Sequence, residues 1–240
     1  AKLEAEQGAE SGLLVVSDMQ SAGRGRRGRG WESPAGINIY YTLMLKPDFS
    51  SDCAPMLTLV MALAVAKGIR QTLRRDSEEA AAKVGIKWPN DIVVDGKKVC
   101  GILTEMSMEQ GYIQHIVIGV GINVRKQEFP EEIRDRAAAI DEQCGFRISR
   151  SQLIADIMEA FEEDYEIFLR THDLKGLRAS YAELLVNQDR EVCVLDPKGE
   201  YRGIARGIND QGELLVERQD GTVEEVYAGE VSVRGIYGYV

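Results

Sequence analysis

Residues 92–103 consist of two apolar runs separated by the pair Asp95-Gly96. An Asp-Gly pair between apolar runs is a strong hairpin signal, because the tightest hairpin turns need positive φ at both central residues. Apolar residues continue through 103–120 and are interrupted at Gln110-Gly111, which predicts a further strand pair. The middle of the chain is therefore expected to form neighbouring strands of one sheet.

The segments before and after these strands in the sequence have apolar residues at helical spacing. Pro55 suits the first turn of a helix whose apolar spacing continues to about Leu73. Ser149 predicts the N-cap of a second helix, with Gln152 completing a capping box. The acidic residues of this second helix, Asp164 among them, are expected on its solvated face. The predicted class is α+β, with a mixed central β-sheet flanked by helices.

The pattern changes from Asn187 onward to short strands and tight turns. Five short strands in such a small segment predict a closed β-barrel appended to the larger domain. The predicted domains are therefore residues 1–186, a catalytic domain, and residues 187–240, a small barrel.

Charge and cysteine usage restrict the classes of function. The 240 residues carry 39 Asp and Glu against 29 Lys and Arg, a formal net charge of −10, which disfavours a general nucleic-acid binder. No apolar run reaches the ~20 residues that a membrane-spanning helix needs. The four cysteines are scattered without metal-ligand spacing and are typical of a reducing cytoplasm. We expect a cytoplasmic protein without membrane or nucleic-acid partners.

The segment from Gly23 to Trp31 concentrates four arginines and four glycines in this acidic chain. Arginine carries a permanently charged, planar guanidinium group whose N–H donors suit phosphate or carboxylate oxygens. Glycine lets backbone N–H groups approach such oxygens. One interpretation is an anion clamp held between two core strands. The alternative is a mobile Arg/Gly loop that stacks on single-stranded nucleic acid.

Two more clusters are expected in loops at strand ends, where sites are often built. In the first, Lys87 precedes a turn formed by Trp88-Pro89-Asn90-Asp91. In the second, Gly119-Val120-Gly121-Ile122-Asn123 combines glycines that permit close approach of a flat ligand with an amide that can read its edge. Each cluster alone also has a plain structural explanation.

Together, in this order, the clusters resemble the biotin protein ligase family. The family pattern G-R-G-R-x-G-R-x-W matches residues 23–31, K-W-P-N-D matches 87–91 and G-x-G-I-N matches 119–123. The pattern K-x-x-G-I-L matches 98–103, and the ending 229–234 resembles the family's SH3-like C-terminal barrel. The resemblance implies a class II synthetase-like sheet and a monofunctional ligase without an N-terminal DNA-binding domain. It also implies a Ser-Thr-Asn segment before Ala1, so the N-terminal part of the catalytic domain is expected to be missing.

The resemblance implies that biotin reacts with ATP to give biotinyl-5′-AMP and then passes to a lysine of a biotin carboxyl carrier protein. Lys87 and Arg26 are the expected catalytic residues. The expected biotin contacts are Gln20, Gly23, Arg24, Gly25, Arg26, Lys87, Gly101 and Gly119. The expected nucleotide contacts are Arg24, Arg26, Trp31 and Asn123. Mg²⁺ is expected with the triphosphate, supported by Asn90 and Asp91. Because members of the family commonly dimerise, the resemblance also implies a possible homodimer.

Two other functions stay open at this level. A lipoate or octanoate ligase of related fold would share the same chemistry, and biotin-dependent against lipoate-dependent pyrophosphate exchange would discriminate them. A nucleic-acid-binding protein that uses the Arg/Gly loop would show affinity that falls steeply with salt.

Overall fold

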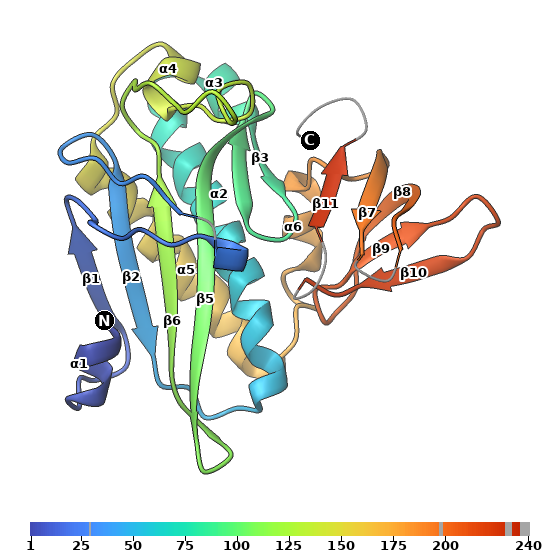
Figure 1. Cartoon of the computed structure of the whole chain (residues 1–240), viewed down its shortest axis with the longest axis horizontal. Helices are drawn as coiled ribbons and strands as arrows, with labels where there is room; N and C mark the ends of the chain where they lie inside the picture. The colour runs from blue at the N-terminus through green and yellow to red at the C-terminus, as the bar shows by residue number, and fades with distance from the viewer. Residues whose placement is uncertain (29, 197–198, 229–231, 236–240) are drawn as a thin grey trace.

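The computed structural model describes residues 1–28, 30–196, 199–228 and 232–235. Two antiparallel sheets organise these residues, a large one in the N-terminal part and a small one in the C-terminal part (Figure 1). The large sheet comprises β1 (Leu13–Ser17), β2 (Ile39–Leu45), β3 (Val84–Lys87), β4 (Asp91–Val94), β5 (Lys97–Glu109) and β6 (Tyr112–Ile122). The main helices are α2 (Leu57–Arg74) and α5 (Arg150–Thr171); the short ones are α1 (Lys2–Glu6), α3 (Glu78–Ala82), α4 (Ile140–Cys144), α6 (Arg178–Leu184) and the 3₁₀ turns η1 (Arg26–Gly28) and η2 (Ser51–Met56).

The strand order of the large sheet is β1-β2-β6-β5-β4-β3. Both predicted hairpins are confirmed: Asp95 and Gly96 have φ of 51° and 74°, and Gln110 and Gly111 have 50° and 87°. The α+β class is also confirmed, but the expectation of a mixed sheet is corrected, because every strand ladder is antiparallel. β2 and β3 run in the same direction, but β6, β5 and β4 lie between them in the sheet. Among the described residues, parallel pairing is confined to isolated bridges.

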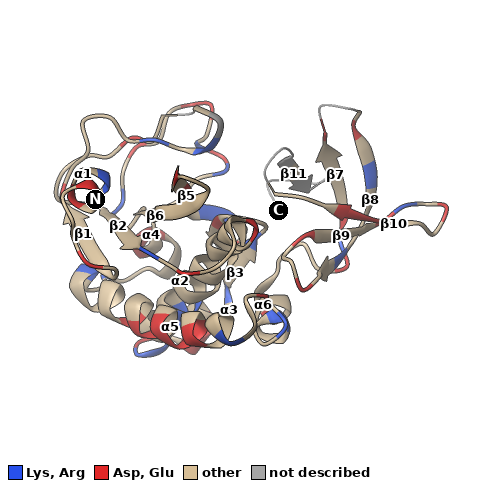
Figure 2. Ribbon diagram, turned by 90° about the horizontal axis from the view of Figure 1, so that it is seen from below, with Lys and Arg blue, Asp and Glu red and all other residues tan. Residues whose placement is uncertain are grey.

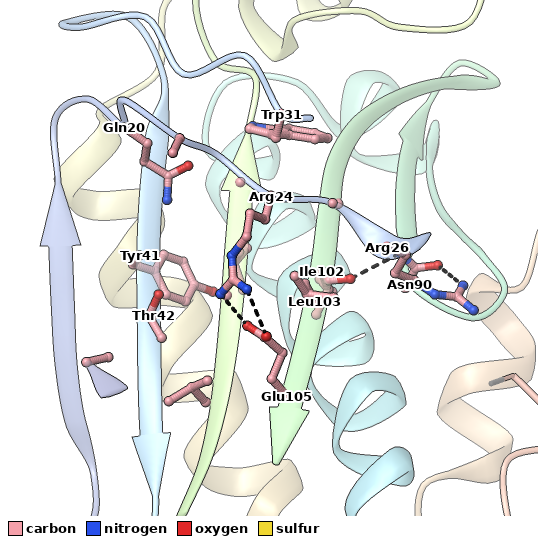
Figure 3. Close-up of a pocket in the computed structure, with 18 of the residues that line it drawn as sticks. Gln20, Arg24, Arg26, Trp31, Tyr41, Thr42, Asn90, Ile102, Leu103 and Glu105 are labelled. Carbon is pink, nitrogen blue, oxygen red and sulfur yellow. Dashed lines mark hydrogen bonds and ion pairs between the residues drawn. The ribbon is translucent and has the colours of Figure 1, made fainter. Parts of the chain in front are cut away.

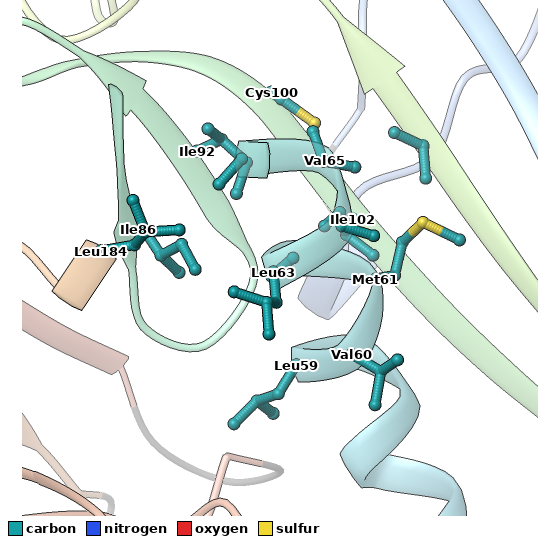
Figure 4. Packing of buried hydrophobic residues seen from close by; sticks show 14 of the residues in the cluster. Leu59, Val60, Met61, Leu63, Val65, Ile86, Ile92, Cys100, Ile102 and Leu184 are labelled. Atoms are coloured by element: carbon teal, nitrogen blue, oxygen red, sulfur yellow. The ribbon is translucent and has the colours of Figure 1, made fainter. Parts of the chain in front are cut away.

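Helices α2 and α5 cover one face of the large sheet (Figure 1). Figure 4 shows side chains of α2 facing those of β3, β4 and β5 in the core. A Cβ atom at Gly68 would lie 2.5 Å from the Ile157 side chain, so this glycine lets the two helices approach closely. The helical stretch Ser51–Arg74 has the length and composition to cross a membrane, which the sequence analysis did not anticipate, but 72% of its most apolar window is buried, as in a core helix.

Helix α5 confirms one half of its predicted cap and corrects the other. The Ser149 hydroxyl accepts a hydrogen bond from the Gln152 N–H, but the Gln152 side chain turns to Asp156 instead of completing a capping box. Acidic residues mark the outer side of α5 (Figure 2), as expected. Asp164 is an exception, because it is fully buried against α2 and paired with Lys67 at 2.5 Å. That burial raises the pKa of the Asp164 carboxyl despite the lysine.

The C-terminal sheet has the order β10-β9-β8-β7-β11, all antiparallel. Its strands are β7 (Glu191–Leu195), β8 (Tyr201–Ile208), β9 (Leu214–Glu217), β10 (Val223–Val226) and β11 (Ser232–Gly235). Residues 229–231, part of the ending matched to the family's barrel, lie outside the described residues. The predicted domain boundary at 186/187 falls between α6 and β7 and stays a prediction.

The turn between β8 and β9 docks against the large domain. Gly212 in this turn has φ +79°, and its carbonyl oxygen accepts a hydrogen bond of 3.0 Å from the Trp88 indole N–H. A Cβ atom at Gly212 would lie 2.9 Å from the side chains of Leu59 and Leu174. The small sheet is therefore packed directly behind the turn that follows Lys87.

Candidate active site

A cavity of about 250 Å³ opens on the sheet face that α2 and α5 leave uncovered. Its walls come from β2, β5 and β6, and the connection between β1 and β2 crosses above them (Figure 3). The lining residues that matter below are Lys2, Gln20, Arg24, Gly25, Arg26, Trp31, Thr42, Asn90, Lys98, Gly101, Leu103, Glu105, Gly119 and Gly121.

A pair of glycines forms a flat floor in this cavity. Gly101 of β5 and Gly121 of β6 are opposite each other in the antiparallel register. The Trp31 ring lies over them, since a Cβ atom at Gly121 would come within 2.7 Å of its Nε1 and one at Gly101 within 3.0 Å of its ring. The Lys98 ammonium lies 5.4 Å from the centroid of the same ring. Only residues without side chains leave room for this planar group.

The arginine-rich loop closes on itself above the floor. The Gly23 carbonyl accepts a 3.0 Å hydrogen bond from the Trp31 N–H, and Arg24 bridges to Gly30. A Cβ atom at Gly23 would lie 2.2 Å from the Trp31 carbonyl oxygen, which explains the glycine. Gln20 is held before the loop, its Oε1 accepting 2.7 Å from the Ser33 hydroxyl. Arg29 lies outside the described residues.

The two arginines at the start of the loop reach different partners. Arg24 makes a two-pronged contact with the Glu105 carboxylate, at 3.1 Å and 2.7 Å. Arg26 donates 2.7 Å to the Asn90 side-chain oxygen, and its other Nη donates to the Ala228 carbonyl in the C-terminal part of the chain. Arg26 therefore links the loop to both the 88–91 turn and the small sheet.

The turn after Lys87 supplies polar partners to the cavity cations. Asn90 donates 3.1 Å to the Ile102 carbonyl while accepting from Arg26. Asp91 lies 2.5 Å from the Lys98 ammonium and 4.0 Å from that of Lys87. Lys98 lines the cavity, whereas Lys87 is 7% exposed and is not among the described lining residues. Of the two lysines that flank Asp91, Lys98 is thus the one that lines the cavity.

Most of the predicted site residues are brought together. Those that line the cavity are Gln20, Arg24, Gly25, Arg26, Trp31, Asn90, Gly101 and Gly119. Gly23 shapes the loop, while Lys87, Asp91 and Asn123 are not among the described lining residues. Asn123 is buried, its N–H donating 2.7 Å to the Val99 carbonyl.

Sequence reasoning missed Lys98, Thr42 and Glu105 as site residues. Lys98 had a signal, because it begins the K-x-x-G-I-L segment three residues before the floor glycine Gly101. Thr42 pairs with Gly119 in the register between β2 and β6. Neither Thr42 nor Glu105 carries a motif that distinguishes it from an ordinary strand residue.

The metal expectation receives limited support from the donors. Within the described part of the chain, no three His, Cys, Asp or Glu side chains gather in a way that could hold a metal ion. Asp91 and Asn90 are oxygen donors of the kind that Mg²⁺ uses, and Mg²⁺ in nucleotide sites usually takes one or two protein ligands beside phosphates and water. These two residues fit that partial role.

Comparison with known proteins agrees with this architecture. The model of the biotin/lipoate A/B protein ligase family matches residues 2–123, and that of the biotin protein ligase C-terminal domain matches 189–234. A bifunctional ligase/repressor BirA of Bacillus spizizenii is 37% identical over 233 residues, covering 95% of this chain and 68% of that protein. A biotin–[acetyl-CoA-carboxylase] ligase of Paracoccus denitrificans is 29% identical, covering 95% of each. The structure of a biotin protein ligase from Aquifex aeolicus in complex with biotin and ATP superposes with a TM-score of 0.81 at 28% identity, covering 98% of this chain and 94% of that one.

Proposed function

The chain belongs to the biotin/lipoate A/B protein ligase family, and from that premise we propose that biotin and ATP react in the cavity above β2, β5 and β6. The activity is ATP-dependent ligation of biotin to a carboxylase carrier protein, with biotin and ATP as substrates. The observation that carries the assignment to this cavity is its construction: four cationic side chains (Lys2, Arg24, Arg26 and Lys98) line it, and the Trp31 ring lies flat on its glycine floor.

The chemistry needs charge neutralisation and positioning more than a nucleophile from the enzyme. The biotin carboxylate attacks the α-phosphate of ATP, a P–O bond to pyrophosphate breaks, and biotinyl-5′-AMP forms. The lysine amine of the carrier protein then attacks the acyl carbon and AMP leaves. Both steps develop negative charge on oxygens, which fixed cations stabilise most effectively in a site that excludes water.

Lys98 is proposed to neutralise the α-phosphate and the biotin carboxylate, the role first predicted for Lys87. Its support is its position beside Trp31 and the cavity, with Asp91 holding its ammonium at 2.5 Å. Lys87 is proposed to support Lys98 indirectly, by adding positive charge near Asp91.

Arg24 and Arg26 are proposed to contact the biotin carboxylate and then to hold the adenylate, helped by backbone N–H groups of Gly23 and Gly25. Trp31 would pack on the adenine side of the ligand, which the glycine floor supports. Gln20, Gly101 and Gly119 are proposed to contact biotin. Asn123, a buried residue directly after β6, is proposed to bind the base.

Mg²⁺ is proposed to accompany the triphosphate, with Asn90 and Asp91 contributing oxygen ligands or hydrogen-bonded waters. Such an ion would neutralise phosphate charge during nucleotidyl transfer. Asp91 would contribute to holding such an ion in addition to its pairing with Lys98.

A homodimer and a cytoplasmic location also remain proposals. Strands β1 and β3 form the two edges of the large sheet, and edge strands can pair with a second copy. The four cysteines are free thiols, as suits a reducing compartment.

Transfer to an acceptor tests the second half of the reaction. The purified chain with biotin, MgATP and a biotin carboxyl carrier domain is expected to add one biotin to a single lysine, detected by intact mass and peptide mapping. The same domain with that lysine changed to arginine is the matched control. Modification of the arginine variant at the same rate, or none of either domain, would contradict transfer to a specific carrier lysine.

A further inference from the structure

Glu105 is the one acidic residue among the described residues that line a cavity otherwise suited to anions. Side chains alternate along β5, so Gly101, Leu103 and Glu105 share the face that opens into the cavity. Figure 3 shows Glu105 below Arg24, with its carboxylate turned toward the guanidinium. An acid placed here by the same strand that supplies the glycine floor is part of the site.

The contact between Glu105 and Arg24 is bidentate and uses both terminal nitrogens of the guanidinium. Arg24 Nη1 lies 3.1 Å from Glu105 Oε1 and Nη2 lies 2.7 Å from Oε2. Lys2 of α1 adds a third bond, at 2.8 Å to Oε1. Burial raises the pKa of Glu105, but the bonds to Lys2 and Arg24 outweigh it and hold this pKa below its ordinary value. The residue is therefore a carboxylate at neutral pH.

A substrate carboxylate or a phosphate that binds the Nη1–Nη2 edge of Arg24 would use the same two nitrogens as Glu105. Fork-to-fork pairing with two parallel N–H···O bonds is the preferred way for arginine to hold either anion. One guanidinium edge cannot hold two such anions at once. A ligand anion that takes this edge must first displace the Glu105 carboxylate.

We propose that Glu105 is a specificity-determining residue that competes with the ligand's anion for Arg24. The inference rests on the proposed role of Arg24 in holding the ligand. When a ligand carboxylate replaces the Glu105 carboxylate on Arg24, the net gain in binding free energy is small. Glu105 therefore reduces the difference in affinity between an anionic ligand and a neutral one. It keeps the affinity for free biotin moderate and returns Arg24 to a paired state when the ligand leaves.

The test compares Glu105→Gln with the unchanged chain by isothermal titration calorimetry, using biotin and the neutral alcohol biotinol as probes. Glutamine keeps the shape of the side chain and removes its charge. Because partly exposed ion pairs contribute modestly, biotin is expected to bind about two- to fivefold more tightly to the variant. Biotinol, which has no carboxylate for Arg24, is expected to bind both proteins equally. Glu109→Gln, on the same strand but away from the described lining, should leave both affinities unchanged.

A double-mutant cycle identifies the cation involved. In an Arg24→Met background the gain from Glu105→Gln should disappear; a gain that persists would assign the effect to Lys2 or to general charge and overturn the proposal. Weaker or unchanged biotin binding by Glu105→Gln, with biotin still bound by the unchanged chain, would overturn competition while leaving the proposed function intact. If neither protein binds biotin, the proposed function fails and the competition fails with it.

Discussion

Replacing Lys98 by methionine is expected to slow biotin-dependent ATP–pyrophosphate exchange by at least ~100-fold, the usual consequence of removing one preorganised charge from developing phosphate oxygens. Lys98 is the lysine beside Trp31 in the cavity, and Asp91 fixes its ammonium at 2.5 Å. Methionine keeps most of the side-chain length and its packing, so the loss would be one of charge. The measurement is the initial rate of exchange at saturating biotin and MgATP.

Lys87→Met is the matched variant, because both lysines flank the same carboxylate and only Lys98 is among the described lining residues. We expect this change to have a clearly smaller effect on exchange than Lys98→Met. A larger loss with Lys87→Met would return the catalytic role to Lys87, as the sequence first suggested.

Replacing Arg26 by glycine is expected to release biotinyl-5′-AMP about 10- to 100-fold faster, since hydrogen bonds that involve a charged group each contribute roughly 1.5–3 kcal/mol. Arg26 joins the loop to Asn90 and to the Ala228 carbonyl, so its loss removes the proposed ligand contact and loosens the loop over the cavity. The measurement is the free biotinyl-5′-AMP that accumulates in the medium without an acceptor protein.

Arg26→Lys separates charge from geometry in the same assay. Lysine keeps the charge but lacks the fork that reaches two partners at once, so an intermediate release rate is expected. Retention of the adenylate by Arg26→Gly at the level of the unchanged chain would show that Arg26 does not hold it.

The central strands were predictable because local turn chemistry determines them. Asp95, Gly96 and Gly111 adopt the positive φ values that Asp and Gly tolerate well, and β4, β5 and β6 follow from these turns. The Ser149 cap was predictable for the same reason, since it needs only a neighbouring N–H. Antiparallel order across the whole sheet was not, because it depends on which distant strands become neighbours.

The placement of some residues depends on tertiary contacts that sequence spacing does not encode. Asp164 has acidic neighbours in the sequence, yet α2 buries it beside Lys67. Lys87 is at the end of β3 and Lys98 is near the start of β5, and both strands are apolar. Strand β4 pairs with each of them, and this tertiary arrangement determines which lysine reaches the cavity. The contacts of Gly212 with Trp88 and of Ala228 with Arg26 join segments more than 100 residues apart. Residues from all three motif clusters line the cavity, and they were predictable together because each cluster is short and contiguous.

The most direct test of the account is acid-dependent ATP–pyrophosphate exchange by the purified chain, with biotin, lipoate and octanoate compared under identical conditions. The account predicts exchange that requires biotin and Mg²⁺ and stays at background with lipoate or octanoate. Exchange that lipoate or octanoate supports as well as biotin, or no exchange with biotin at all, would contradict the claim that this cavity activates biotin.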